Sequence, residues 1–234
     1  YGRGINGTKD SFNERGYAVV VQDIRGTGES EGDTSIFYAD GWRADYHDGL
    51  DTIEWIKQQE WCDGKIATYG GSALAMTQML LAPASQDIAA QFMDMVPASL
   101  YGQVIYQGGV WRKSLAEGWL EHGVHQPEVA EEWKAHPTYD EYWKYYNIGE
   151  KIADVTAPAL LVGGWYDIFQ QGTIEQFVLR QNEAGEGARG NQHLIMKWST
   201  HGDDRPDLPI ELNQNRFDDM HVSQHRKAFL DYYM

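Results

Sequence analysis

A serine set among small residues, directly after a strand-like run, is the feature that most limits how this chain can fold. Residues 65–69 alternate polar and apolar side chains in the manner of a β-strand, and the hexapeptide Gly-Gly-Ser-Ala-Leu-Ala follows at 70–75. A strand that reverses sharply into a helix crowds its own backbone, and small side chains on both sides of the turn relieve the clash. The sequence therefore predicts a strand, a turn at Ser72 and a helix.

This turn would place two chemical groups at the carboxyl edge of a sheet. The hydroxyl of Ser72 would be open to a substrate, and the amide of Ala73, at the start of the helix, would point toward an oxygen that becomes negative during attack. These features favour a serine nucleophile with an oxyanion site. The hexapeptide alone fits a simple loop equally well, because such a motif stays a hypothesis until its partners are found.

A serine nucleophile needs a base, and the base needs a carboxylate that fixes its tautomer. After a turn of this kind the chain order is serine, then Asp or Glu, then histidine. Asp167 follows a predicted strand at 159–163, and His201 follows another at 193–196. Asp167 could instead cap the helix after it. We predict the triad Ser72, Asp167 and His201 over seven competing histidines: His47, His122, His125, His136, His193, His221 and His225.

Length and charge narrow the class of protein. The chain has 234 residues, which suits one α/β core. Its 35 acidic and 19 basic side chains give a net charge of −16, which argues against a nucleic-acid partner because phosphate contacts need clustered Lys and Arg. We expect a small-molecule substrate as the partner, and the sequence is compatible with a homo-oligomer.

Other classes of site find little support. A single cysteine, Cys62, excludes an intrachain disulfide and has no neighbour at zinc-binding spacing. No apolar run reaches the roughly 18 residues of a membrane span, so no membrane association is expected. The loop Gly26-Thr27-Gly28 lacks the third glycine of a dinucleotide fingerprint. The sequence thus predicts neither a metal nor an organic cofactor.

Strand-like and helix-like segments alternate along the chain, as in a mostly parallel sheet with crossover helices. We expect strands at 17–21, 66–69, 89–96, 159–163 and 193–196, and helices at 42–59, 74–81, 173–181 and 223–234. Residues 99–147 are rich in Trp and Tyr with little strand pattern. Those rings could form a core or line a pocket for an apolar acyl group. We predict a core of 1–98 and 148–234 with an inserted helical cap at 99–147.

Three stretches of the chain resemble the Xaa-Pro dipeptidyl-peptidase and cocaine-esterase type of α/β-hydrolase, which includes α-amino-acid ester hydrolases and glutaryl acylases. They are residues 15–26 with Ser-Glu-Gly at 30–32, the approach Trp-Cys-Asp-Gly-Lys-Ile (61–66) before the serine turn, and Gly-Trp-Tyr-Asp at 164–167. The resemblance implies the α/β-hydrolase fold, the roles given to the triad, and a phenol from Tyr1 beside the Ala73 amide in the oxyanion hole. It also implies strands before Tyr1 and a β-sandwich after Met234, so we expect an excerpt of a longer protein.

The function predicted from these features is hydrolysis of a carboxylic ester or α-amino-acyl ester through an acyl-enzyme. An amidase, acylase or Xaa-Pro dipeptidyl-peptidase is the alternative, favoured if Glu117, Glu121 or Glu141 converge on the pocket to bind a substrate amine. An inactive binding module is an alternative of another class. It is motivated by Ala73 and Ala75, where the family has Tyr and Gly, and by an extra residue before His201.

Overall fold

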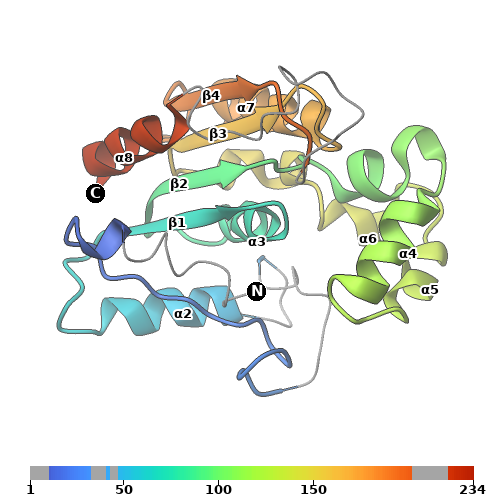
Figure 1. Ribbon diagram of the computed structural model, residues 1–234, viewed down its shortest axis with the longest axis horizontal. Helices are drawn as coiled ribbons and strands as arrows, with labels where there is room; N and C mark the ends of the chain where they lie inside the picture. Colours follow the sequence, from blue (N-terminus) through green and yellow to red (C-terminus); the bar gives the residue numbers. More distant parts are fainter. Residues whose placement is uncertain (1–10, 33–40, 43–46, 202–220) are drawn as a thin grey trace.

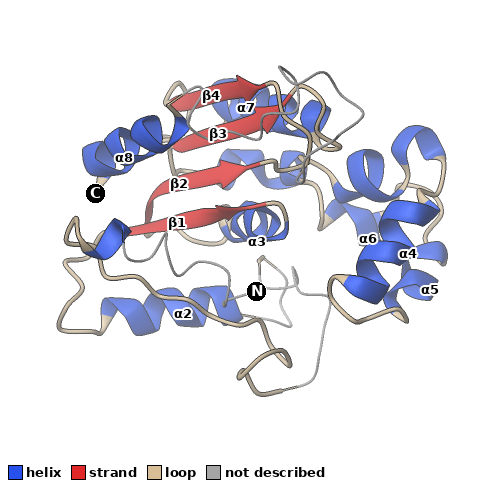
Figure 2. Cartoon of the chain, in the orientation of Figure 1, coloured by secondary structure: helices blue, strands red, loops and turns tan. Residues whose placement is uncertain are grey.

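A parallel sheet with helices on both faces organises the chain (Figures 1 and 2). The computed structural model describes residues 11–32, 41–42, 47–201 and 221–234. Its four strands are β1 (Ile66–Gly71), β2 (Ile88–Asp94), β3 (Ala159–Gly164) and β4 (Gln192–Lys197). They pair in parallel in the order β1-β2-β3-β4. Together with its structural relatives, described below, this sheet confirms the predicted α/β-hydrolase fold class.

The helices cover both faces of the sheet, and successive side chains of a strand show which helices lie on which face. Phe92 and Met93 are neighbours on β2 and point to opposite faces. Met93 packs in the core cluster that contains α3 (Ala73–Leu81) and side chains of α7 (Gln170–Glu183). Phe92 packs in the cluster that contains Phe229 of α8 (Val222–Tyr233). The sheet is therefore buried on both faces, which suits the fully buried apolar run of β3.

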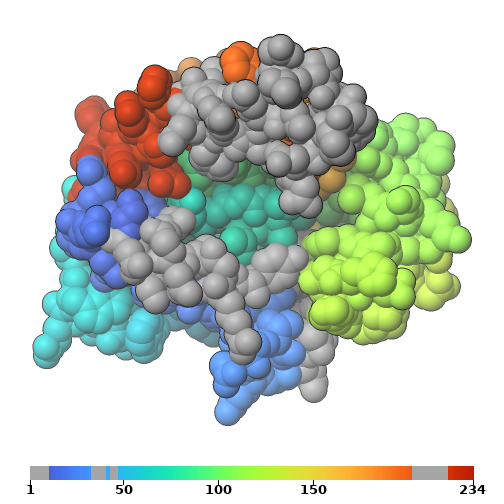
Figure 3. All heavy atoms as spheres, viewed as in Figure 1, coloured from blue at the N-terminus to red at the C-terminus, as the bar shows by residue number. Residues whose placement is uncertain are grey.

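The aromatic segment between β2 and β3 folds into helices that lie beyond the carboxyl ends of the strands (Figures 1 and 3). These are the π-helical turn η2 (Tyr101–Ile105), the 3-10 turn η3 (Gln107–Gly109), and the α-helices α4 (Lys113–His122), α5 (Val129–Lys134) and α6 (Glu141–Lys144). The 3-10 turn η4 (Ile148–Asp154) then leads back to the start of β3 and contacts α7. Trp133, Trp143 and Tyr146 are almost completely buried among them. These rings build the interior of the helical lobe. The division into core and cap at 99 and 147 stays a prediction.

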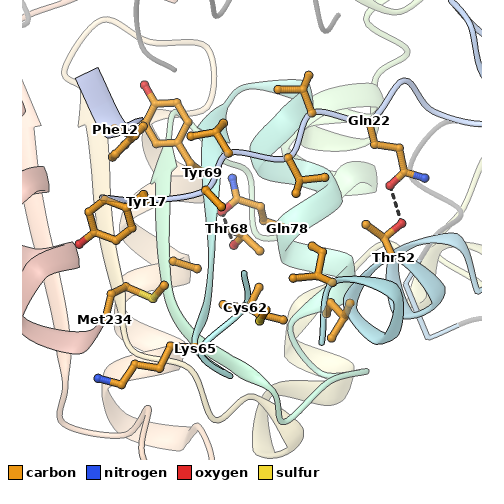
Figure 4. Close-up of a pocket in the computed structure, with 18 of the residues that line it drawn as sticks. Phe12, Tyr17, Gln22, Thr52, Cys62, Lys65, Thr68, Tyr69, Gln78 and Met234 are labelled. Atoms are coloured by element: carbon orange, nitrogen blue, oxygen red, sulfur yellow. Dashed lines mark hydrogen bonds between the residues drawn. The ribbon is translucent and has the colours of Figure 1, made fainter. Parts of the chain in front are cut away.

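The strand expected at 17–21 is wrong. The segment has no strand structure, and Val20 and Val21 are each 41% exposed. Tyr17 of this segment donates to Asp231 of α8 at 2.9 Å, and Gln22, the next residue after it, accepts from Thr52 of α2 (Asp48–Lys57) at 2.6 Å. A cavity of about 750 Å³ is lined by this segment, β1 and α3 (Figure 4). Within the described residues, β1 thus pairs with β2 alone.

Candidate active site

Ser72 lies at the predicted turn, between the last residue of β1 and the first residue of α3. Its backbone has φ 54° and ψ −120°, and few residues other than glycine adopt such a positive φ without strain. The turn is fixed by a hydrogen bond from the Ser72 amide to the Asp94 carbonyl at 2.8 Å. Gly70 permits the close return of the helix, because a Cβ there would lie 2.4 Å from the Cβ of Leu74. The strained backbone holds the Ser72 hydroxyl at the sheet edge.

The Ala73 amide belongs to the free N-terminal end of α3. As the first helical residue it has no carbonyl one turn earlier to bond to, and the helix dipole adds partial positive charge at this end. An oxygen that gains negative charge beside Ser72 would be stabilised there. Tyr1, the second predicted oxyanion donor, lies outside the described residues, and its role stays a prediction.

Asp167 follows β3 in a tight turn, and its two carboxylate oxygens have different partners. Oδ1 accepts a hydrogen bond from the Phe169 amide at 2.6 Å, in the turn that leads into α7. Oδ2 lies 2.6 Å from Nδ1 of His201. The side chain has no exposed surface. Asp167 therefore orients the histidine, and it is not the cap of α7, because the N-cap residue is Phe169 and the Asp167 carboxylate bonds, in this turn, to the amide of that residue.

His201 connects the serine to the aspartate. Its Nε2 lies 2.8 Å from the Ser72 hydroxyl oxygen, while its Nδ1 faces Asp167. The ring of Phe169 packs edge-on against the imidazole, with 4.7 Å between the ring centroids. The structure thus brings the three predicted side chains into one hydrogen-bonded chain, although Thr200 and Ser199 make the loop one residue longer than the family pattern.

The loop that carries His201 lies against the turn that carries Asp167. The Trp165 amide donates to the Lys197 carbonyl at 2.7 Å, and the Tyr166 amide donates to the Ser199 carbonyl at 3.1 Å. A Cβ at Gly164 would lie 2.2 Å from that Ser199 carbonyl oxygen. Glycine at 164 is therefore the residue that lets the two loops approach closely enough for Asp167 to reach His201.

Two buried charged residues beside the triad were missed by the sequence reasoning. Asp94 ends β2, Lys197 ends β4, and the Lys197 Nζ lies 3.4 Å from Oδ2 of Asp94. Burial raises the pKa of Asp94, and the Asp167 carboxylate raises it further, while Lys197 and His201 lower it. The available signal was the position of each residue at the end of an apolar run, where a charged side chain is ordinarily read as the start of a loop.

The acidic residues proposed to bind a substrate amine have partners inside the helical lobe. Glu117 lies 3.0 Å from the Nζ of Lys134, and this hydrogen bond lowers the pKa of Glu117. Glu141 lies 2.5 Å from the Nζ of Lys144. Glu121 lies 3.9 Å from Nε2 of His122 on the exposed face of α4. None of these contacts joins a carboxylate of this set to the triad.

Metal binding and membrane insertion find no support in the described part of the chain. Among its residues, no group of three or more His, Cys, Asp and Glu side chains is arranged to hold a metal ion. No helix in the same part is long and apolar enough to cross a membrane. The cavity of about 750 Å³ is lined by neither Ser72, Asp167 nor His201. The triad is therefore the strongest candidate site.

Known proteins are similar to this chain in sequence or in fold. Cocaine esterase from Rhodococcus sp. (strain MB1 Bresler) is 28% identical over an alignment 220 positions long, and the alignment covers 74% of this chain and 38% of the esterase. An aminopeptidase from the marine sediment archaeon Thaumarchaeota archaeon superposes with a TM-score of 0.70 at 20% identity, over 96% of this chain and 45% of that one. The α/β hydrolase GrgF from Penicillium sp. sh18 gives a TM-score of 0.61 at 14% identity, over 99% and 85%.

The chain therefore spans less than half the length of the esterase and of the aminopeptidase. A family model described as X-Pro dipeptidyl-peptidase (S15 family) matches residues 4–132 and 114–203, which is most of the chain. Both the sequence motifs and the sheet agree with that match. The chain belongs to the X-Pro dipeptidyl-peptidase (S15) family of α/β-hydrolases.

Proposed function

We propose that this protein is a serine hydrolase that cleaves a carboxylic ester or α-amino-acyl ester through an acyl-enzyme on Ser72. The observation that carries the proposal is the continuous chain from Ser72 Oγ to His201 Nε2 at 2.8 Å and from His201 Nδ1 to Asp167 Oδ2 at 2.6 Å. Family membership and the likeness to a cocaine esterase support the same class of reaction.

Each residue has a defined part in the proposed reaction. Ser72 Oγ attacks the carbonyl carbon while His201 Nε2 takes its proton, and Asp167 stabilises the resulting imidazolium through Nδ1. The Ala73 amide donates to the oxyanion of the tetrahedral intermediate. The imidazolium then gives its proton to the leaving group, and a water molecule, activated by the same histidine, releases the acid.

Aromatic side chains near the triad suit an apolar or aromatic acyl group. Trp165 and Tyr166 directly precede Asp167 and are each 52% exposed, and Trp198, three residues before His201, is 43% exposed. Exposed rings on the two loops that carry Asp167 and His201 provide apolar surface for an acyl chain to cover. This arrangement supports an ester with a bulky acyl group as the first substrate to test.

An amide substrate is the second candidate, and the family description supports it. Acyl transfer to water needs the same triad for esters and amides, so the leaving group decides between them. A panel of p-nitrophenyl esters and Xaa-Pro p-nitroanilides separates the two. We expect faster release from the esters, and release from the Xaa-Pro anilides alone would establish the peptidase alternative.

Reaction with a fluorophosphonate probe tests the nucleophile itself. We expect mass spectrometry of the labelled chain to find the adduct on Ser72, and expect no adduct in Ser72→Ala. Ser114→Ala is the matched control, because Ser114 is an exposed serine on α4 and its loss should leave labelling unchanged. A folded wild-type chain that takes no label would overturn the proposal and favour the inactive binding module.

A further inference from the structure

Met95 has a backbone conformation that is unusual for its side chain. It follows the last residue of β2, and its φ is 54°, a positive value that bulky residues rarely adopt. The other described residues with a positive φ, glycines apart, are Ser72, His125 and His221. Histidine adopts a positive φ several times more often than most residues do, and Ser72 forms the strained turn of the nucleophile. Met95 therefore needs an explanation of its own.

The strained methionine lies beside the nucleophile. Gly71 of β1 and Asp94 of β2 are opposite each other in the parallel register, and Ser72 and Met95 are the next residues of the two chains. The Ser72 amide donates to the Asp94 carbonyl at 2.8 Å, so the chains are still paired at this point. Paired strands are about 4.8 Å apart. Ser72 and Met95 are thus neighbours at the carboxyl edge of the sheet.

Hydrogen bonds on both sides of Met95 hold its backbone in place. The Met95 amide donates to the Val162 carbonyl of β3 at 2.7 Å. The carbonyl of the next residue, Val96, accepts from Thr173 Oγ1 of α7 at 3.0 Å, and the Val96 amide donates to the same oxygen at 3.2 Å. A strained φ persists only where the surrounding structure fixes it, and such residues cluster at active sites.

The Met95 side chain lies outside the described hydrophobic core. It is half-buried, and it belongs to none of the hydrophobic clusters of the described residues, either as a buried member or as a side chain packed against them. Its chain neighbours Met93 and Val96, in contrast, are completely buried in the cluster that contains α3. Core packing therefore does not explain a strained methionine at this position.

Contact with a substrate would explain both the position and the residue type. An acyl group bonded to the Ser72 hydroxyl oxygen begins one strand spacing from Met95, a distance that the methionine side chain can cover. Methionine is flexible and polarisable, and it adapts to apolar ligands of different shapes. The exposed rings of Trp165, Tyr166 and Trp198 lie on the loops after β3 and β4, whereas Met95 follows β2 and adjoins the nucleophile itself.

We propose that Met95 is a specificity-determining residue, whose side chain contacts the acyl group on Ser72 and favours acyl chains longer than acetyl. The proposal rests on the proposed function of Ser72. It assigns to Met95 the acyl carbons near the carbonyl, and it leaves the more distant part of a bulky acyl group to the exposed rings.

A series of p-nitrophenyl esters from acetate to octanoate tests this contact, because all members share one leaving group. Met95→Gly removes the side chain and relieves the positive φ. We expect the wild-type kcat/KM to rise with chain length. In Met95→Gly the hexanoate value should fall by about tenfold, and the acetate value should change by less than about twofold. Met95→Leu, which keeps an apolar side chain of similar size, should retain most of the wild-type preference.

His125→Gly is the matched control for the change in backbone. His125 is an exposed residue of the helical lobe with a φ of 58°, so the substitution relieves a similar conformation away from the strand ends. We expect it to leave the ester series unchanged. A change of chain-length preference in His125→Gly as large as in Met95→Gly would overturn the assignment of the effect to the Met95 side chain.

Urea titrations separate a role in the site from a role in the core. A methionine packed in the core loses stability when it is truncated, whereas Met95→Gly gives up few core contacts and relieves backbone strain. We expect its urea midpoint to equal or exceed that of the wild type. A clearly lower midpoint, or an ester series with the wild-type dependence on chain length, would overturn the proposal.

Two fluorophosphonate probes, with an ethyl and an octyl chain, separate this proposal from the proposed function. We expect Met95→Gly to slow labelling of Ser72 by the octyl probe about tenfold more than labelling by the ethyl probe. If both probes label Met95→Gly in the wild-type ratio, the proposed function stands and the role of Met95 fails. A folded wild type that takes neither probe overturns both.

Discussion

At the scale of single residues, the site depends on one point where two backbone segments lie too close together for a side chain to fit between them. Gly164, the last residue of β3, lies against the Ser199 carbonyl. The amide bonds of Trp165 and Tyr166 to the His201 loop hold this approach. The distance between His201 and Asp167 therefore depends on a glycine with no side chain, whose carbonyl also accepts a hydrogen bond from the Asp167 amide at 3.2 Å.

Gly164→Ala should separate these two loops. A new Cβ would lie 2.2 Å from the Ser199 carbonyl oxygen, so the loop of His201 must move, and we expect fluorophosphonate labelling to slow by about tenfold or more. Gly118→Ala on α4 is the control, because a Cβ there meets no described atom within 4 Å. That variant should label normally and gain about 0.5–1 kcal/mol of stability. Equal labelling rates in the two variants would contradict the argument.

At the scale of elements, the parts of the fold that could be predicted are those whose sequence pattern depends only on neighbouring residues. The buried run of β3 and the small residues around Ser72 needed no knowledge of distant contacts. The segment at 17–21 has an equally strong strand pattern, but a strand also needs a partner. The side chains of Tyr17 and of the adjacent Gln22 bond instead to α8 and α2. Asp94 and Lys197 were missed for the same reason. Their side chains meet only in the folded sheet, where β3 lies between the strands that carry them.

Among the buried residues of helix α7, Thr173 bonds to the loop that follows β2. Thr173 Oγ1 donates to the Val96 carbonyl at 3.0 Å and accepts from the Val96 amide at 3.2 Å. Thr173→Val keeps the shape but leaves both backbone groups buried without partners, so we expect a loss of about 1–3 kcal/mol. Thr77→Val is the control, since Thr77 is half-buried and its hydroxyl bonds, among the residues that the structure describes, only to the Leu74 carbonyl of its own helix. Urea titrations should show a lower midpoint for Thr173→Val with an unchanged slope, and similar losses in both variants would refute the role of Thr173.

At the scale of the whole molecule, the net charge of −16 opposes the compact state. The described ion pairs are largely exposed, such as Lys57 with Asp87 and Lys144 with Glu141, and exposed pairs contribute little. General repulsion among the acidic side chains should therefore outweigh the attraction within these pairs. Added salt screens both, and the sign of its effect on stability shows which is larger.

We expect salt to stabilise this protein at pH 8 and to do so much less at pH 5. Raising NaCl from about 0.02 M to about 0.5 M shortens the screening length from roughly 20 Å to roughly 4 Å. Weaker repulsion should raise the Tm at pH 8 by about 2–4 °C, the shift that about 1 kcal/mol produces in a chain of this size. At pH 5 the net charge is close to zero, because the pI is near 4.8, and little repulsion remains to be screened. Calorimetry at both pH values measures the difference, and a Tm that falls with salt at pH 8 would mean that the ion pairs outweigh the repulsion.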